Sequence, residues 1–402
     1  MENLNIRSAE KSITDMPGVF GSGVHCGLKA KNKDLALIYV PQASASAGVF
    51  TKNAFPAAPV VHTKEAMTRA TIKAIVANSG NANACTGSRG KEDVKKTAEQ
   101  TAKWLSLGPD EIAIASTGII GKPLDIESLL SGLEELCRDP KESAGRDAAE
   151  AILTTDTCVK EVWRECEIEG KTIAVAGMTK GSGMIAPNMA TTLSFATTNV
   201  AIEPTRLQSM LRNAIDTTLN MTSVDSDTST SDMALLIATG EHELDWANPE
   251  TVKAYAALLE SAFEGLALKL VRDGEGATKV IELAVTGAKS VREARLIARS
   301  VINSPLVKTA MYGQDPNWGR ILMAAGKTEG VEIDPEKVSL HLGKHCIVED
   351  GQPTNISRDK IRPSLAGETV HMHLELNLGE SAAKAWGCDL THAYVDINTA
   401  YN

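Results

Sequence analysis

Short apolar strands alternate with amphipathic helices along the whole 402-residue chain, and this alternation restricts the possible folds more than any other feature. Several strands alternate apolar and polar residues with period two, which is typical of half-buried strands. The mixture predicts an α+β or layered α/β architecture. The predicted strands are 35–40, 71–77, 111–115, 172–177, 192–200, 233–238, 279–286 and 370–377, and the predicted helices are 204–219, 249–270 and 290–302.

The helix predicted over 204–219 shows the pattern most clearly. Pro204 stands at a first-turn position, and leucine or isoleucine then recurs every four residues from Leu207 to Leu219. We find no internal repeat, low-complexity segment or Pro/Ser-rich linker, so composition alone predicts no domain boundary.

Composition limits the classes of partner. The chain is 43% hydrophobic, which is enough for one large core or two joined ones. Its formal net charge of -10, without a long run of like charges, argues against nucleic acid or an anionic membrane as the main partner. Residues 1–20 carry charges where a signal peptide would have its apolar region, and no apolar run is long enough to span a membrane. We expect a cytoplasmic protein.

Three features invite a metal or redox interpretation, and each has a simpler one. The seven cysteines are scattered without a C-x-x-C pair, which favours reduced thiols, and we expect Cys85 to be a small buried residue. His371 and His373 share one strand face but have no third ligand in their motif, so we expect no metal there. The acidic loop 225–232 lacks the glycine and final glutamate of an EF-hand, and local turns explain it.

The segment from Lys180 to Leu193, KGSGMIAPNMATTL, is the most informative for chemistry. It is a glycine-rich loop that ends in an Ala-Thr step just before a strand. An interior threonine is a poor nucleophile without a base, whereas an N-terminal threonine has its own α-amine, with a pKa of about 8. The Thr191 hydroxyl would first have to attack the Ala190 carbonyl and break the chain. By spacing alone, a glycine-rich loop before a strand is more often an ordinary turn.

This segment is very similar to the cleavage-site signature of the glutamate N-acetyltransferase (ornithine acetyltransferase) family. Further blocks resemble that family in the same order, so the resemblance covers essentially the whole chain. They are residues 78–87 (NSGNANACTG), 116–121 (STGIIG), 225–232 (DSDTSTSD), 271–279 (VRDGEGATK), 304–310 (SPLVKTA) and 313–320 (GQDPNWGR).

The resemblance implies an α+β layered sandwich of the ornithine acetyltransferase and N-terminal-nucleophile aminopeptidase type. It implies self-cleavage at Ala190–Thr191 into an α chain, 1–190, and a β chain, 191–402, with two copies of each in the assembly. The implied reaction moves the acetyl group of N2-acetyl-L-ornithine to L-glutamate through an acetyl-threonine intermediate, without cofactor or metal. Acetyl-CoA is compatible with the same motifs as a second donor.

The family's catalytic residues correspond to three positions. Thr191 matches the nucleophile of both self-cleavage and acetyl transfer, and it also contacts substrate. Thr117 and Gly118, which we predict in a turn after the strand 111–115, match the pair that holds the tetrahedral oxyanion. A hydroxyl and a backbone N–H are suitable donors for that role.

Four further positions match residues that bind substrate. Lys180 is expected to bind the α-carboxylate that acetylornithine and glutamate share, and Glu275 to bind an ammonium group. Thr157 matches a substrate-contacting threonine, with Thr154 as the alternative register. Asn398 matches a contact near the C-terminus.

Two other classes of function remain as alternatives. An N-terminal-nucleophile amidase or aminopeptidase would share the self-cleavage but pass its acyl group to water. A binding protein without catalysis would have no reason to cleave at Ala190–Thr191.

Overall fold

The computed structural model describes residues 4–186 and 192–400. Two compact units make up the chain, and each is described separately. Unit 1 comprises Met1–Gly181, Pro187–Asn220 and Thr228–Leu266, and unit 2 comprises Ser182–Ala186, Met221–Asp227 and Ala267–Asn402. The predicted division into 1–190 and 191–402 concerns a cleavage point rather than a compact unit, and it stays a prediction.

The first sheet of unit 1 carries the strands on either side of the glycine-rich segment. Lys180 pairs with Leu193 across an antiparallel ladder, and Leu193 pairs with Met233 across a parallel one. These three residues therefore lie side by side at one end of the sheet. The strand order is β1 (Arg7–Ser8), β7 (Lys160–Ile168), β8 (Lys171–Lys180), β9 (Leu193–Ala201), β11 (Met233–Glu243) and β4 (Ala45–Phe50).

Two strands of the second sheet of unit 1 continue beyond the ends that the sequence predicts. The order of this sheet is β2 (Phe20–Val24), β3 (Leu35–Tyr39), β5 (Ala74–Asn81) and β6 (Ile112–Ile119). Thr117 and Gly118 lie in β6, paired with Ser79 and Gly80 of β5, so the predicted turn after residue 115 is wrong. Both strands continue because their polar ends still pair with each other, and the facing glycines allow a close approach.

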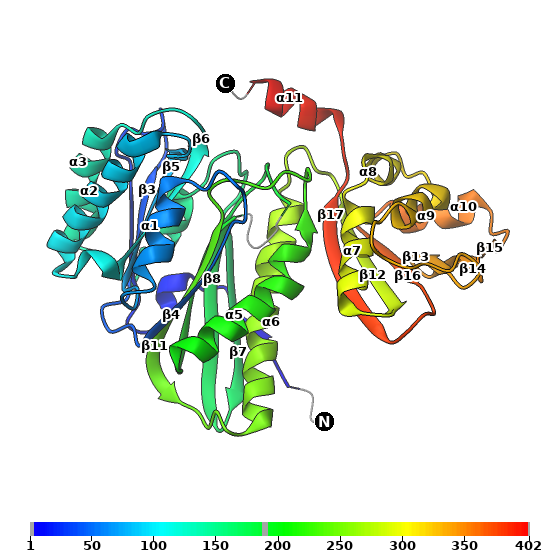
Figure 1. Cartoon of the computed structure of the whole chain (residues 1–402), viewed down its shortest axis with the longest axis horizontal. Coiled ribbons are helices and arrows are strands. Elements are labelled where there is room, and N and C mark those ends of the chain that lie inside the picture. Colours follow the sequence, from blue (N-terminus) through cyan, green and yellow to red (C-terminus); the bar gives the residue numbers. More distant parts are fainter. Residues whose placement is uncertain (1–3, 187–191, 401–402) are drawn as a thin grey trace. The chain divides into compact units, whose positions relative to one another are not determined.

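Unit 1 is built in layers (Figure 1). A core that includes Ile38, Ile75, Phe195 and Leu235 fills the space between the two sheets. The other face of the second sheet buries Leu37 and its neighbours against α2 and α3. The helices are α1 (Ala58–Ala66), α2 (Gly87–Leu105), α3 (Ile126–Arg138), α4 (Gly145–Ala151), α5 (Pro204–Thr217) and most of α6 (Pro249–Arg272), with 3-10 turns η1 (Ile13–Asp15), η2 (Pro109–Glu111) and, at the unit boundary, η3 (Leu219–Met221).

Unit 2 packs helices on one mixed sheet. Ile297 and Val301 of α7 are fully buried in a core with Leu283 and Trp386 of the sheet. The strand order is β10 (Thr222–Ser223), β17 (Ser381–Cys388), β12 (Val280–Ala288), β16 (Thr369–Glu375), β13 (Ser339–Leu342), β14 (His345–Glu349) and β15 (Gln352–Pro353). The helices are α7 (Val291–Ile302), α8 (Pro305–Tyr312), α9 (Trp318–Gly326), α10 (Arg358–Ile361), η4 (Arg362–Leu365) and α11 (His392–Ala400).

Mixed sheets with layered helices confirm the predicted α+β class. The three predicted helices correspond to α5, α6 and α7, and each predicted strand corresponds to a strand with shifted ends. Among the helices of residues 4–186 and 192–400, none is both long and apolar enough to cross a membrane.

Candidate active site

Thr117 and Lys180 come together in unit 1 from different sheets. The Lys180 Nζ donates a hydrogen bond to Thr117 Oγ1 at 3.1 Å, and each residue is only 8% exposed. Because the Thr117 oxygen accepts from a cation, its hydroxyl hydrogen is directed toward another acceptor. A hydroxyl polarised in this way is a strong donor for a developing negative charge.

Gly118 has a backbone conformation that excludes other residues. Its φ is +134°, and a Cβ at this position would lie 2.4 Å from the carbonyl carbon of Gly80. A side chain would push β6 away from β5 and move Thr117 with it. Glycine therefore holds Thr117 in register beside its partner strand.

Asp156 anchors this site, and the sequence did not single it out. Its Oδ1 accepts hydrogen bonds from Lys160 Nζ at 2.6 Å and from the Gly181 N–H at 2.7 Å, and the carboxylate and Lys160 side chains are fully buried. Burial alone would raise the pKa of the Asp156 carboxyl, but the charges of Lys180 and Lys160, with hydrogen bonds, hold it at about 2. The end of β8 is thereby fixed.

The same carboxylate contacts Thr154, one of the two threonines considered for substrate contact. The Thr154 N–H donates to Asp156 Oδ2 at 2.9 Å, and its hydroxyl lies 3.4 Å from the same oxygen. Thr154 thus has a structural contact, and Thr157 is exposed. The assignment of the substrate contact to Thr157, with Thr154 as the alternative register, stays a prediction.

A second buried carboxylate, Asp232, lies directly before β11. The next residue, Met233, donates its N–H to the Thr192 carbonyl at 2.9 Å. Asp232 Oδ2 has no hydrogen-bond partner in the described ranges, and burial raises the pKa of this carboxyl well above its usual value although Lys180 opposes the shift. The predicted cleavage residues, Ala190 and Thr191, lie outside the described residues.

Glu275 and Asn398 come together in unit 2. The Asn398 Nδ2 donates to Glu275 Oε2 at 2.8 Å and to the Tyr394 carbonyl at 2.9 Å. Glu275 is buried in the turn after α6, and its N–H donates to the Ser182 carbonyl at 2.9 Å. Asn398 is exposed on α11, a helix that the sequence did not predict. A single amide thus orients the carboxylate that we expect to bind an ammonium group.

Asp225 holds the glycine-rich loop of unit 2. Its carboxylate accepts from the N–H groups of Met184 at 2.6 Å and Ile185 at 2.9 Å, and Met184 has a φ of +56°. The Asp227 N–H also donates to Asp225 at 3.2 Å, an Asx turn of the kind predicted for this loop. Tyr394 donates to the same carboxylate at 3.4 Å, and burial together with the negative charge of Asp225 raises its pKa.

The remaining candidates lie outside these contacts. Cys85 is exposed, so the prediction that it is buried is wrong: its left-handed backbone, with φ +56°, occurs in the turn between β5 and α2. His373 Nε2 hydrogen-bonds to Thr286 at 2.8 Å, and His371 lies 3.4 Å from Glu282. Across the described ranges, no group of three or more His, Cys, Asp or Glu residues is arranged to hold a metal ion.

Comparison with known sequences identifies the family. Residues 21–402 match the ArgJ family. The arginine biosynthesis bifunctional protein ArgJ of Bacillus licheniformis is 42% identical over 407 residues, covering 99% of this chain and 98% of the relative. The protein of the same name from Shouchella clausii is 44% identical over 395 residues, covering 97% and 96%.

Two solved structures are also similar. The arginine biosynthesis bifunctional protein of Bacillus halodurans is 38% identical and has a TM-score of 0.45, covering 47% of this chain and 100% of that one. Ornithine acetyltransferase of Mycobacterium tuberculosis, complexed with ornithine, is 38% identical with a TM-score of 0.44, covering 46% and 100%. The fold assignment follows from the strand pairing rather than from these partial superpositions. The family expected from the motifs is confirmed, and the chain belongs to the ArgJ family.

Proposed function

We propose that this enzyme transfers the acetyl group of N2-acetyl-L-ornithine to L-glutamate, in arginine biosynthesis, through an acetyl ester on Thr191. The observation that carries the proposal is the hydrogen bond from Lys180 to the buried hydroxyl of Thr117. The names of the relatives from Bacillus licheniformis and Shouchella clausii support the pathway, and the similar ornithine acetyltransferase supports the reaction.

The first half-reaction forms the ester. The Thr191 hydroxyl attacks the acetyl carbonyl carbon while the Thr191 α-amine takes its proton. Thr117 Oγ1 and the Gly118 N–H donate to the tetrahedral oxyanion. The amide C–N bond then breaks, the proton passes from the α-amine to the leaving nitrogen, and ornithine departs.

The second half-reaction regenerates the threonine. The α-amine of glutamate attacks the ester carbonyl, the C–O bond breaks, and Thr191 recovers its hydroxyl proton as N-acetylglutamate leaves. The same donors serve both tetrahedral intermediates. The site must exclude water while the ester exists, because hydrolysis would waste the acetyl group.

Substrate recognition is assigned to charged and hydroxyl groups. Lys180 binds the α-carboxylate common to both amino acids, and its contact with Thr117 links binding to the oxyanion donors. Glu275 binds an ammonium group, with Asn398 fixing one of its oxygens. Thr157 adds a hydroxyl contact.

The N-terminal amine requires self-cleavage between Ala190 and Thr191. We propose that the products, residues 1–190 and 191–402, assemble as two copies of each in the cytoplasm, where free thiols such as Cys85 are stable. The word bifunctional in the relatives' names favours a second activity. Acetyl-CoA as a second acetyl donor to glutamate is the candidate that the family resemblance implies.

Ornithine release with and without glutamate tests the transfer. With N-acetylornithine alone, mass spectrometry should show slow release after one turnover, and glutamate should accelerate it strongly because an oriented amine outcompetes water. Varying both substrates should give parallel double-reciprocal lines, and Thr191→Ala should release no ornithine. Equal steady-state rates with and without glutamate would identify a hydrolase, and intersecting lines would exclude the acetyl-threonine intermediate.

A further inference from the structure

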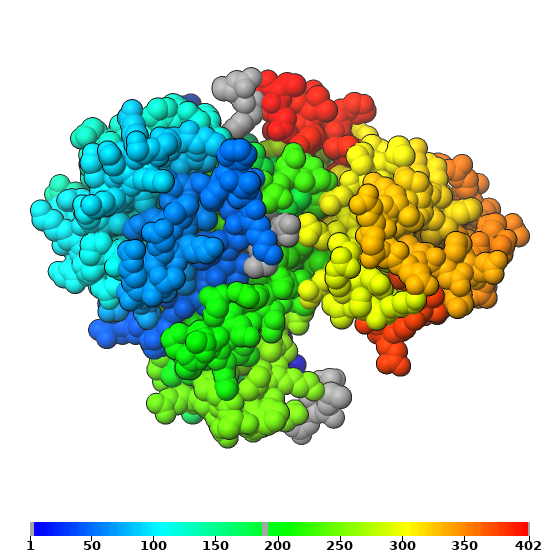
Figure 2. Space-filling model, viewed as in Figure 1, coloured from blue at the N-terminus to red at the C-terminus, as the bar shows by residue number. Residues whose placement is uncertain are grey.

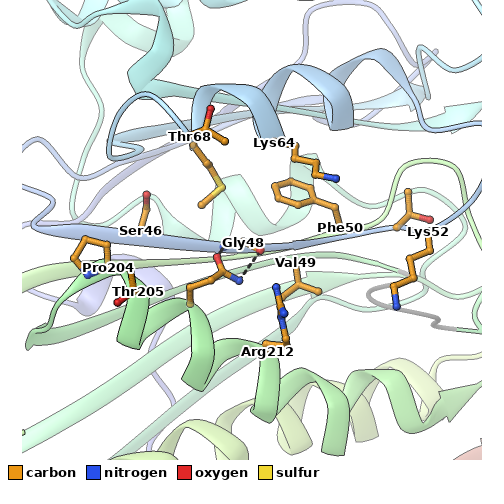
Figure 3. Close-up of a pocket in the computed structure, with 13 residues that line it drawn as sticks. Ser46, Gly48, Val49, Phe50, Lys52, Lys64, Thr68, Pro204, Thr205 and Arg212 are labelled. Atoms are coloured by element: carbon orange, nitrogen blue, oxygen red, sulfur yellow. Dashed lines mark hydrogen bonds between the residues drawn. The ribbon is translucent and has the colours of Figure 1, made fainter.

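A cavity of about 520 Å³ lies in unit 1 along the outer edge of β4, the last strand of the first sheet. Helices α1 and α5, blue and green in Figure 2, both reach the surface beside it. Figure 3 shows α1 on one side of β4 and α5 on the other. The lining residues are Ser46, Gly48, Val49, Phe50, Thr51, Lys52, Lys64, Met67, Thr68, Pro204, Thr205, Gln208 and Arg212. They include none of the residues assigned to acetyl transfer.

The floor of this β4 cavity is already hydrogen-bonded. The Gly48 N–H donates to Gln208 Oε1 at 3.0 Å, and Gln208 Nε2 donates to the Gly48 carbonyl at 3.0 Å (Figure 3). One side-chain amide therefore takes the place that a further strand would occupy. An added peptide strand could not pair at Gly48 without displacing Gln208, so the cavity is better suited to a small molecule.

All the charged residues that line the cavity are cations. Lys52 follows β4, Lys64 extends from α1 and Arg212 from α5, and the lining contains no aspartate or glutamate. Within the part of the chain that the structure describes, none of these three cations forms an ion pair. Such a cationic group is unexpected on a chain with a formal net charge of -10, and it attracts anions.

The two acidic residues directly beside lining residues in the sequence have local partners. Glu65, which follows Lys64, lies 3.9 Å from Arg69, one turn along. Glu203, which precedes the cavity residue Pro204, accepts from the Arg206 N–H at 3.0 Å and from the hydroxyl of the lining residue Thr205, as the N-cap of α5. Both carboxylates therefore have local partners, and an incoming anion would meet the cations of the cavity.

The rest of the lining is apolar or carries hydroxyl groups. Val49, Phe50 and Met67 offer a surface for an apolar or aromatic body, whereas the hydroxyls of Thr51 and Thr68 already donate to the carbonyls of Ser229 and Glu65. The volume lies within the range of about 300–1,000 Å³ usual for small-ligand pockets. A doubly charged group with three terminal oxygens can use several cations at once, whereas a carboxylate has only two oxygens.

We propose that the β4 cavity binds a small phosphate monoester whose organic part is apolar or aromatic. The proposal is independent of the acetyl transfer assigned above. Phenyl phosphate is a suitable probe, because it combines a dianion with an aromatic ring. Inorganic phosphate lacks the ring, and benzoate replaces the phosphate with a carboxylate.

Calorimetric titration of the full chain with the three probes, at low salt and pH 7.5, tests this site. Phenyl phosphate should bind at least tenfold more tightly than inorganic phosphate or benzoate. The double variant Lys64→Glu/Arg212→Glu should weaken that binding by at least tenfold. The matched double variant Lys96→Glu/Lys103→Glu, which changes net charge equally on exposed positions of α2, should change it less than twofold.

Each other outcome overturns the proposal. No saturable phenyl phosphate binding to the wild-type chain would mean that the cavity is not a site. Equal weakening in both double variants would mean a nonspecific charge effect. Inorganic phosphate binding as tightly as phenyl phosphate would exclude the apolar contribution, and tighter benzoate binding would assign a carboxylate ligand.

Discussion

The two groups of candidate residues are built differently. In unit 1, Thr117 and Lys180 lie within strands, are almost entirely buried, and are steadied by the fully buried Asp156. In unit 2, Glu275 lies in a turn and is held by Asn398 on an exposed helix. A group that stabilises a transition state must be fixed before the reaction, whereas a group that recognises a flexible substrate tolerates some movement. We therefore expect changes at Thr117 to reduce kcat and changes at Asn398 to raise KM.

The largest effect should come from Thr191→Ala, because the proposed mechanism has a single nucleophile. Wild-type protein should run as two fragments, 1–190 and 191–402, with Thr191 found by N-terminal sequencing. The variant should remain a single inactive chain, because the attacking hydroxyl is gone. Thr191→Ser keeps a hydroxyl and should retain some cleavage with slower transfer. Normal processing of Thr191→Ala, or a fully active uncleaved wild type, would refute the assignment.

Thr117→Ala should have the next largest effect and tests the unit 1 half of the comparison. Removing one oxyanion donor typically lowers kcat by about 10²–10³ fold, while KM changes little. Thr117→Ser keeps the hydroxyl that Lys180 contacts and should retain most of the activity. A raised KM with an unchanged kcat would instead make Thr117 a binding residue and remove the proposed difference between the units.

The sequence named the candidate residues but not the contacts around them. Motif order identified Thr117, Lys180, Glu275 and Asn398, and the structure pairs them two by two. The sequence placed Thr117 in a turn, because a Ser-Thr-Gly stretch is typical of turns. In the structure the stretch pairs with the neighbouring strand β5 and continues β6 instead. Local propensity does not include that long-range ladder.

Contacts between segments far apart in the sequence were the hardest to predict from it. Asp156 has little in its local sequence to mark it, and its importance comes from the N–H of Gly181 and the charge of Lys180. Lys52, Lys64 and Arg212 line the β4 cavity but come from three separate segments of the sequence, so no sequence motif identifies it. Predicting such sites requires the fold first.

Asp156→Asn should reduce stability and tests whether unit 1 is fixed by buried charge. Lys160 would lose the carboxylate charge that its buried ammonium contacts, so we expect a loss of about 3 kcal/mol or more in the free energy of unfolding, measured in urea at pH 7. Asp139→Asn, which removes an exposed pair with Lys141, should cost about 1 kcal/mol at most. Equal losses would show that burial of the pair is unimportant.

The pH dependence follows from the same carboxyl. The folded chain lowers the pKa of Asp156 from 3.8 to about 2, so its stabilising contribution is complete above about pH 4 and is lost as the pH falls toward 2. The stability difference between wild type and Asp156→Asn should therefore shrink between pH 4 and pH 2. A difference that stays constant across this range would contradict the charge-based explanation.

Asn398→Ala should have the smallest effect and tests the unit 2 half of the comparison. Its amide holds one oxygen of Glu275, and a hydrogen bond typically contributes about 1 kcal/mol, which corresponds to less than a tenfold change in binding. We expect KM for N-acetylornithine to rise about fivefold with kcat nearly unchanged, because Glu275 remains present but is less well oriented. Thr399→Ala, the neighbouring exposed position on α11, is the matched control and should leave KM unchanged. A fall in kcat as large as that of Thr117→Ala would mean that the exposed helix takes part in the chemical step, and the two units would then share the catalytic work rather than divide it.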